Sequence, residues 1–346
     1  MNDAAATGAG RRRRVTISDV ADHAGVSVGT VSRVLNQAEN CGLDVRRRVR
    51  ESIEALGYVP NYAARSLKRD LTTQIGLVVP DLANPVYSQM VVGVQHEAAA
   101  AGYHLNVTNS GGTWSEERLA LQSLEERQVD GVVLCSLQMT PSVVRAVEAH
   151  ADAVCVIGGL PMESPVDNVR LDSETGAALA VQHLLDGGRE RVAFLNGTVG
   201  TTPHASRDRG YRRALRDADI EYDERLVALA DFTMAGGYEG MRDLWERGTD
   251  FGGLLCANDA MALGALRYLQ ERGVAVPERL GVVGMDDIEA ARMSTPTLTT
   301  VTSLARERGR IACQLLLARL TSEEDRDPEK ITVTPKLILR ESSAPA

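Results

Sequence analysis

The sequence predicts an α/β protein whose body has two parallel-sheet lobes and is preceded by a small helical unit. From Thr72 onward, short runs rich in Val and Leu recur, and each is followed by an amphipathic helical stretch. This alternation is typical of parallel sheets with helices on both faces. Before residue 60, apolar residues instead follow helical spacing between glycines. The 346 residues, 44% hydrophobic and 25% charged, suffice for two or three domains.

The first 14 residues are small and polar and then basic, so we expect a disordered basic arm over residues 1–14. Residues 1–70 carry 12 basic and 8 acidic residues, whereas the whole chain has a net charge of −9. An acidic body would be repelled by DNA, so the basic N-terminal end is the one suited to a polyanion. Chance variation between short segments is the alternative explanation.

Residues 15–60 are expected to contain three short helices. Thr16 and Asp19 have the spacing of a capping box that starts the first helix. Gly25 suits the left-handed position that ends this helix, and Ser27 is a favourable cap for the second.

The third helix is expected to be capped by Asp44 and to end at Gly57. Three short helices joined by a tight glycine turn describe a helix-turn-helix unit, with a purely structural helical hairpin as the alternative. In such a unit the second helix reaches base edges while the first crosses the DNA backbone. Hydroxyls and backbone amides suit phosphate, and arginine suits guanine or phosphate. The exposed positions of the second helix are predicted to be Ser27, Val28, Gly29, Thr30, Ser32 and Arg33.

Eight apolar runs in the remainder are predicted to be strands. Eight strand–helix units exceed one comfortable open sheet, so we expect two similar lobes. Several runs end in Asp, Asn or Gly, at the sheet edge where open α/β sheets bind ligands. The runs are IGLVVPD, HLNVTNS, GVVLCS, AVCVIGG, RVAFLNG, LVALAD, GGLLCAND and LGVVGMDD.

Several classes of protein are disfavoured by missing patterns. The five cysteines are widely spaced and show no metal-ligand spacing, which favours a reducing cytoplasm. No apolar run approaches 18 residues, so no membrane span is expected. A G-x-S-x-G match at residues 25–29 follows a polar helical stretch rather than a strand, so a nucleophile elbow is rejected. No other motif indicates an enzyme, a metal or a cofactor.

The segment VTISDVADHAGVSVGTVSRVLN resembles the DNA-binding head of the LacI/GalR (lac repressor) family of bacterial transcription regulators. The likeness continues in order through LGYVPNYAARSL, IGLVVPDLANPVY, SRDRGYRRAL, ANDAMALGALRYLQERGVAVPERLGVVGMDD, PTLTTV and LILRES, over about residues 15–342. The ordered set is far more specific than any one motif.

The resemblance implies roles in DNA binding for positions of the head and of the segment that follows. Val28 and Gly29 match the positions that discriminate operators, and Arg33 is the strongest base-reading candidate. Residues 61–71 match a hinge helix and linker, in which Leu67 matches a leucine that wedges into the minor groove. The full set of DNA-contacting candidates is Thr16, Ser27, Val28, Gly29, Thr30, Ser32, Arg33, Asn36, Asn61, Ala64 and Leu67.

For the body, residues 72–342, the resemblance implies a periplasmic-binding-protein-like fold of two lobes, with a small-molecule effector, such as a sugar, between them. Bidentate carboxylates and arginines suit hydroxyl groups, and an aromatic wall suits a sugar ring. The implied contacts are Asp81, Asn84, Tyr87, Arg207, Phe232, Asn258 and Asp286. Asp81 and Asp259 could instead cap helices, and Phe232 could belong to the core. Residues 343–346 are expected to be a tail.

Two residues differ from the family pattern near this expected pocket. Val86 stands where an aromatic residue is common, and so does Met285. We therefore expect weaker ring stacking, and a non-sugar effector stays open.

The resulting hypothesis is a cytoplasmic, homodimeric repressor that binds a pseudo-palindromic operator and a small-molecule effector, without cofactor or membrane partner. The chain ends without a heptad-repeat tail, so no tetramer built on a coiled coil is expected. The alternatives are a solute-binding protein, which would leave residues 15–70 unexplained, and a DNA-binding regulator with a degenerate cleft and no effector.

Overall fold

The computed structural model describes residues 15–35, 41–58, 71–322 and 324–343. The chain forms two compact units, with the division between Leu71 and Thr72. The predicted arm and the DNA-contacting candidates Asn36, Asn61, Ala64 and Leu67 lie outside the described residues.

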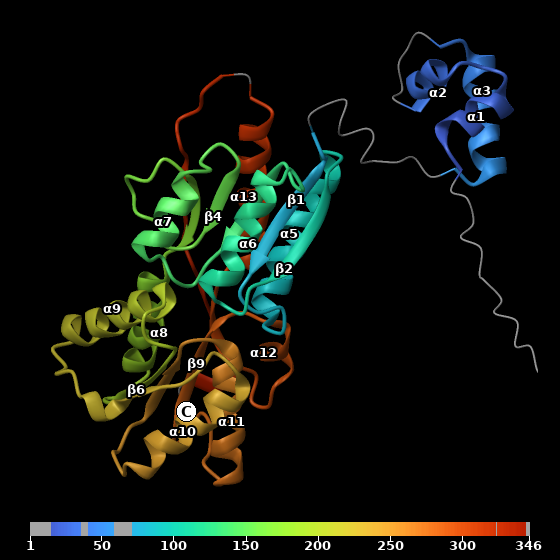
Figure 1. Ribbon diagram of the computed structural model, residues 1–346. Coiled ribbons are helices and arrows are strands. Elements are labelled where there is room, and N and C mark those ends of the chain that lie inside the picture. Colours follow the sequence, from blue (N-terminus) through green and yellow to red (C-terminus); the bar gives the residue numbers. More distant parts are fainter. Residues whose placement is uncertain (1–14, 36–40, 59–70, 323, 344–346) are drawn as a thin grey trace, which may run out of the picture. The chain divides into compact units, whose positions relative to one another are not determined.

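The first unit contains the three expected helices, α1 (Ile17–Ala24), α2 (Val28–Leu35) and α3 (Leu43–Leu56) (Figure 1). The Thr16–Asp19 capping box is present, and Gly25 and Gly57 end α1 and α3 in the left-handed conformation. The Ser27 hydroxyl accepts a hydrogen bond from the Thr30 amide at 3.2 Å, which caps α2 as predicted.

A small apolar core holds the three helices together. At its centre lie Val20, Val31 and Val49, one from each helix, all fully buried. Beside this core, His23 of α1 is hydrogen-bonded to Ser52 of α3 at 3.0 Å. The helices therefore form one packed unit rather than independent segments.

The prediction that Asp44 caps α3 is wrong. The helix begins at Leu43, and its N-cap is Gly42, whose lack of a side chain leaves no capping hydrogen bond. Asp44 lies inside the first turn, where a carboxylate still favours the positive end of the helix dipole. Its side chain forms an exposed ion pair with Arg47 at 3.4 Å.

The second unit contains two lobes, each built on a six-stranded sheet (Figure 1). In the first lobe the strand order is β11-β5-β4-β3-β1-β2, and all pairs are parallel. Its elements are β1 (Gln74–Val79), α5 (Pro85–Ala100), β2 (His104–Asn109), α6 (Trp114–Glu125), β3 (Gly131–Cys135), α7 (Pro141–Glu148), β4 (Val154–Ile157), β5 (Asp167–Leu171), α13 (Ala305–Leu320) and β11 (Lys330–Val333).

Alternating strand residues place helices on both faces of this sheet. Val133 and Cys135 of β3 pack against α5 and α13, while Val132 and Leu134 pack against α6 and α7. Helix α13 comes from near the end of the chain and packs beside α5. The central strands are apolar on both faces because both faces are covered.

The second lobe has the strand order β12-β10-β9-β8-β6-β7, in which only the short β12 runs antiparallel to its neighbour. Helices α8 and α9 pack together, as do α10 and α11. The elements are α8 (Ser173–Asp186), β6 (Val192–Asn196), α9 (Thr202–Asp217), η1 (Glu224–Leu226), β7 (Val227–Leu229), α10 (Met234–Glu246), β8 (Gly253–Cys256), α11 (Asp259–Glu271), β9 (Gly281–Asp286), α12 (Glu289–Met293), β10 (Thr299–Thr302), β12 (Leu337–Ile338) and η2 (Glu341–Ser343).

The chain crosses between the lobes three times, after β5, after β10 and after β11. Away from these crossings, the lobes also touch where α9 begins. The Thr202 amide donates a hydrogen bond to the Leu137 carbonyl of the first lobe at 2.8 Å. At this point the two lobes are therefore joined by a hydrogen bond and not by a crossing of the chain.

All eight predicted runs form strands, whereas β5, β10, β11 and β12 were not predicted as strands. Ser343, expected to start a free tail, is instead buried and donates a hydrogen bond to the Thr299 hydroxyl at 2.7 Å. It therefore belongs to the second lobe. Among the described residues, no helix is both long and apolar enough to cross a membrane.

Candidate nucleic-acid interface and ligand cavity

The start of α2 carries a small exposed surface. Ser27, Val28, Gly29 and Arg33 are exposed, and Val28 is 43% exposed although it is apolar. A Cβ atom on Gly29 would meet only the Ser27 hydroxyl, at 3.8 Å. Glycine weakens a helix, and no described residue of this unit lies close enough to require it at this position. Its small size would therefore matter toward the outside.

The hydroxyls at this helix start are partly engaged within the unit. The Ser27 and Thr30 hydroxyls lie 2.9 Å apart, and Thr30 is half-buried, as is Ser32. The Arg33 Nε atom donates to the Gly29 carbonyl at 3.3 Å, so the guanidinium lies along the same exposed face. Thr16 is exposed, but its hydroxyl donates to Asp19 at 2.7 Å in the capping box.

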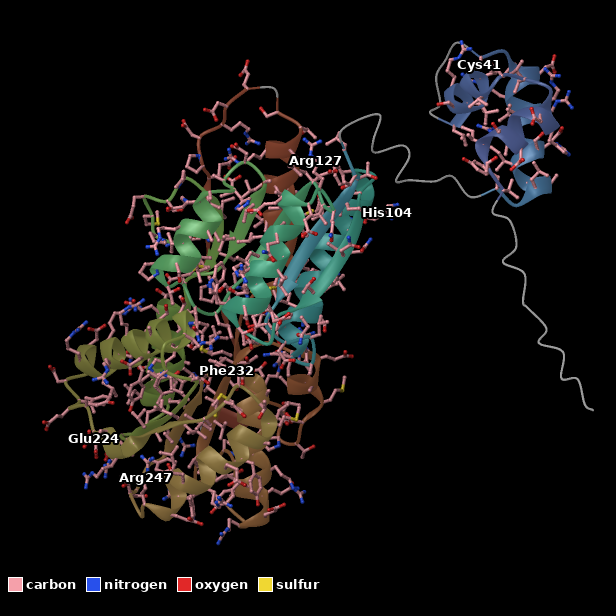
Figure 2. All side chains as sticks on the ribbon, viewed as in Figure 1. Cys41, His104, Arg127, Glu224, Phe232 and Arg247 are labelled. Atoms are coloured by element: carbon pink, nitrogen blue, oxygen red, sulfur yellow. The ribbon has the colours of Figure 1, made fainter. Side chains whose placement is uncertain are left out.

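A cavity of about 420 Å³ lies where the carboxyl ends of the strands of both lobes meet. This volume falls within the range of small-molecule sites. Phe232, at the junction of the lobes in Figure 2, is one of the predicted residues that line it. The structure brings six of the seven predicted residues to this cavity: Asn84, Tyr87, Arg207, Phe232, Asn258 and Asp286.

Arg207 of α9 and Asp286 at the end of β9 form the polar centre of the cavity. Both side chains are buried, yet no ion pair within 4 Å joins them in the described part of the chain. The Arg207 Nε atom is buried without a hydrogen-bond partner there. Burial raises the pKa of Asp286 to about 6, although Arg207 and Arg308 favour its charged form. A hydroxylated ligand between the two groups would satisfy both.

The other predicted residues form the walls. The Asn258 amide group donates to the Phe232 carbonyl at 3.0 Å, while its oxygen caps α11 through the Met261 amide at 2.8 Å. This bond holds the Phe232 loop against α11. Phe232 also packs on the core of the second lobe, and the Arg207 guanidinium lies 5.9 Å from its ring centre. The expectation that Phe232 belongs either to the core or to the cavity is resolved as both.

Asn84 and Tyr87 enter from the first lobe. The Asn84 oxygen caps α5 through the Val86 amide at 3.1 Å, so this side chain joins helix and cavity. Burial raises the pKa of Tyr87 well above its ordinary value, so its phenol stays neutral. A neutral phenol can donate to a ligand oxygen or accept from a ligand hydroxyl.

Asp81, the seventh predicted residue, does not line the cavity. It is exposed in the loop after β1, where its carboxylate accepts a hydrogen bond from the Ala83 amide at 2.9 Å. Asp259 does not cap α11 either. Its two buried oxygens accept from the Ile288 amide at 2.9 Å and the Thr300 hydroxyl at 2.5 Å.

Of the two residues that differ from the family pattern, Val86 and Met285, only the first is among the described residues that line the cavity. Val86 is buried and lines the cavity. Met285 does not line it, because it packs inside the second lobe, 3.1 Å from the position that a Cβ atom on Gly176 would take. Among the described residues that line the cavity, the aromatic ones are Tyr87 and Phe232.

Several cavity residues were not predicted from the sequence. The most notable is Arg308 of α13, which reaches the cavity from the helix that follows a crossing. Ser136 also lines it, and its hydroxyl donates to the buried Glu117 carboxylate behind the cavity wall at 2.9 Å. Burial raises the pKa of Glu117 to about 7, while the Ser136 hydrogen bond opposes this rise. Other unpredicted polar residues are Arg170, Asp172, Ser173, Glu174, Thr202, Ser206, Arg209 and Thr332.

Both units of the chain contain segments that match known protein families. The family described as bacterial regulatory proteins, lacI family, matches residues 16–61, and the periplasmic binding protein-like domain matches residues 181–343. In the described part of the chain, no group of His, Cys, Asp and Glu side chains could hold a metal ion.

Two curated relatives align with almost the whole chain. The HTH-type transcriptional regulator CelR of Thermobifida fusca is 36% identical over 340 residues, covering 96% of this chain and 99% of the relative. The HTH-type transcriptional repressor PurR of Vibrio atlanticus (strain LGP32) is 35% identical over 319 residues, covering 91% of this chain and 94% of the relative. The chain therefore belongs to the lacI family of bacterial regulatory proteins, as its motifs predicted.

A solved structure supports the same placement. The lac repressor dimer bound to operator and the anti-inducer ONPF matches with a TM-score of 0.85 at 27% identity, covering 96% of this chain and 99% of that one. The predicted fold class, a helix-turn-helix unit followed by two parallel-sheet lobes, is confirmed. The relatives are named as transcriptional regulators or repressors rather than enzymes.

Proposed function

We propose that this protein is a cytoplasmic transcriptional repressor that binds a pseudo-palindromic operator as a homodimer. A small molecule in the cavity between the lobes changes the affinity of this binding. The single observation that carries the proposal is the cavity itself, with a buried Arg207 whose Nε atom has no partner among the described residues. A polar group left unsatisfied in a buried site costs stability unless a ligand completes it.

The head surface supports DNA binding. The side chains of Ser27, Thr30, Ser32 and Arg33 suit phosphates and base edges, whereas Val28 and Gly29 can only read shape or a thymine methyl. A dimer would place two such helices in successive major grooves, which explains why the operator should be pseudo-palindromic. Asn36, Asn61, Ala64 and Leu67 enter this proposal only through the family resemblance.

Solved complexes of similar proteins support the proposal that the body binds a ligand and the head binds DNA. One similar structure is a CelR–cellobiose complex, with a TM-score of 0.73 at 33% identity, covering 95% of this chain and 100% of that one. Another is the lac repressor dimer on its operator. By analogy, the cavity lined by Arg207 and Asp286 holds the effector, and the head binds DNA.

We infer that ligand binding acts on the head through the first lobe. Ligand contacts come from both lobes, since Asn84 and Tyr87 belong to the first and Arg207 and Asp286 to the second. A ligand that favours one lobe arrangement shifts the equilibrium toward it. Where β1 begins, the Asp130 carboxylate accepts hydrogen bonds from the Thr72 and Thr73 amides, each at 2.7 Å. The first residues of the body are thus fixed to the first lobe and would follow its movement.

The proposal is tested by capturing fragments of the source genome with the purified full-length protein and sequencing them. The capture is repeated with pooled small metabolites added. We expect one enriched pseudo-palindrome whose recovery changes when metabolites are present. Recovery of an operator that no metabolite affects would favour a regulator with a degenerate cleft, and tight ligand binding without any enriched DNA would favour a solute-binding protein.

A further inference from the structure

The charges around the cavity do not balance. Its lining contains four arginines and three carboxylates: Arg170, Arg207, Arg209 and Arg308 against Asp172, Glu174 and Asp286. One arginine and one carboxylate cancel directly, because Arg209 Nε lies 2.9 Å from Glu174. Glu174 is also held by Arg213 at 3.1 Å.

The remaining arginines have no carboxylate partner. In the described part of the chain, no ion pair within 4 Å involves Arg170, Arg207 or Arg308. Arg170 is oriented by neutral groups, since it donates to the Asn168 side-chain oxygen at 2.6 Å and to the Leu160 carbonyl at 2.7 Å. The Asp172 carboxylate is engaged in capping α8, where it accepts from the Thr175 amide at 3.0 Å.

Arg308 is the least expected of these charges. It is 9% exposed, and its Nε atom donates to the Ser303 carbonyl at 2.8 Å. Its two Nη atoms have no hydrogen-bond partner among the described residues. Burial lowers the pKa of Arg308, and the nearby Arg207 lowers it further, while Cys135, Asp286 and Tyr87 act in the opposite direction.

Two buried guanidinium groups therefore share a single buried carboxylate. Asp286 interacts electrostatically with both Arg207 and Arg308. An uncompensated buried charge is strongly unfavourable, and leaving it beside a like charge adds to the cost. Three further carboxyls in the described part of the chain are buried outside the lining. Asp167 forms an ion pair with Arg319. Burial raises the pKa of the other two, Asp259 and Glu117, to about 7. They therefore supply only partial negative charge near neutral pH.

A neutral polyol could satisfy Arg207 and Asp286 but would leave Arg308 without a counter-charge. A carboxylate or phosphate presents two oxygens to a guanidinium fork and supplies the missing charge. Hydroxyl and amide groups of Ser136, Asn84 and Thr202 line the same cavity and suit the hydroxyls of such a ligand.

We propose that the effector is a polyhydroxylated acid, bearing a carboxylate or a phosphate, and that Arg308 selects it by binding the acidic group. This inference rests on the proposed function, because it takes the cavity to be the effector site. It adds a charge class for the ligand and a specificity-determining residue on α13.

The test compares acids with neutral counterparts of the same chain length on the full-length protein. Calorimetric titrations use D-gluconate against D-sorbitol and D-glucose 6-phosphate against D-glucose, so the two pairs separate a carboxylate from a phosphate. We expect the acid to bind at least about tenfold more tightly than its neutral partner in one pair. Equal or weaker binding of the acids in both pairs, including no binding at all, overturns the inference.

Variants assign the preference to Arg308. Arg308→Met should remove the preference for the acid, whereas Arg308→Lys should keep most of it because the charge remains. Arg242→Met is the matched control, since Arg242 is exposed on α10 and pairs with Glu239 at the surface. Thermal unfolding of each variant checks that it folds. If the methionine variant does not fold, the lysine variant and Arg308→Gln carry the comparison, and an acid preference that survives in folded Arg308→Gln refutes the role of Arg308.

Measurements of operator binding distinguish a failure of the proposed ligand class from a failure of the proposed function. A neutral sugar that changes operator affinity while acids do not would overturn the charge class and leave the proposed function standing. An acid that binds through Arg308 but never changes operator affinity would support the ligand class and contradict the proposed regulation.

Discussion

Replacing Gly159 with alanine should keep the two lobes from meeting as they do here. Gly159 follows β4 in the first lobe and lies against Thr202, the first residue of α9 in the second. An added Cβ atom would lie 2.3 Å from Thr202 Cγ2, 3.3 Å from its Oγ1 and 3.4 Å from its Cβ. Gly159 does not have a positive φ, so the clash, and not backbone strain, is the perturbation.

The size of the effect follows from these distances. Carbon atoms in good contact lie about 3.5–4.0 Å apart, so the alanine methyl is more than about 1 Å too close. Overpacking of this kind costs about 1–3 kcal/mol. The neighbouring hydrogen bond from the Thr202 amide to the Leu137 carbonyl would lengthen as the lobes separate. If the ligand binds the arrangement seen here, its affinity should fall by about 5- to 150-fold.

Calorimetry with the tightest-binding probe measures this loss, and a second substitution identifies its cause. Thr202→Ala removes the γ atoms, after which the alanine at position 159 meets only the Cβ atom at 3.4 Å. The double variant should therefore recover to the affinity of Thr202→Ala alone, because that single variant accounts for the loss of the Thr202 hydroxyl from the cavity. Unchanged affinity in Gly159→Ala, or no recovery in the double variant, would refute the reasoning.

Four further substitutions test other parts of the molecule. Arg207→Ala should leave operator affinity intact but abolish the ligand response, and an unchanged response in a gel-shift titration would contradict its role. Glu117→Gln should be more stable than the parent at pH 8 by up to about 3 kcal/mol. The parent Glu117 holds its proton until about pH 7 when folded but only until about 4.5 when unfolded. The parent therefore loses stability as the pH rises from about 4.5 to about 7. The free energies of unfolding of the two proteins should converge below pH 4.5. Thermal unfolding that shows the same difference at every pH would contradict this reasoning. Gly29→Ala should stabilise α2 by about 0.5–1 kcal/mol yet alter operator affinity, whereas unchanged binding to the captured operator would exclude a close approach of DNA. Leu67→Ala should weaken operator binding far more than nonspecific binding, and equal losses in fluorescence anisotropy would count against the wedge.

Local spacing predicted the head well because its determinants are local. The capping box at Thr16 and the left-handed glycines at 25 and 57 each depend on a few neighbouring residues. Asp44 shows the limit of this reasoning. Gly42 could begin the helix without a side-chain cap, so the nearest favourable capping residue was not the one used.

The strands that were not predicted contain polar residues, whose hydrogen-bond and ion-pair partners lie elsewhere in the fold. In β5, Asp167 is buried because Arg319 of α13 forms a bidentate ion pair with it at 2.8 and 3.0 Å. Asn168 next to it is buried because its amide group donates to the Val156 and Gly158 carbonyls. The partners of Asp167 and Asn168 are not neighbours in the sequence, so these polar residues obscure the apolar pattern by which a buried strand is predicted.

The prediction of the cavity residues depended on the family resemblance more than on the spacing of residues in the sequence. Arg207 and Asp286 come from distant segments of the second lobe, and the resemblance placed both at the cavity. Arg308 was missed because its helix lies in the first lobe after a crossing, and the sequence alone does not show which face of that helix meets the cavity. Asp81 lies outside the cavity lining for a local reason, since its carboxylate accepts a hydrogen bond from the nearby Ala83 amide.

The most direct test of the central claim is the affinity of the captured operator for the full-length protein with and without a ligand that binds the cavity. Fluorescence anisotropy at fixed salt concentration measures both affinities, since protein–DNA binding depends strongly on salt. We predict a change of about fivefold or more with the parent protein, in either direction, and none with Arg207→Ala. An operator affinity that stays constant while the ligand saturates the cavity would contradict the claim that this cavity controls DNA binding.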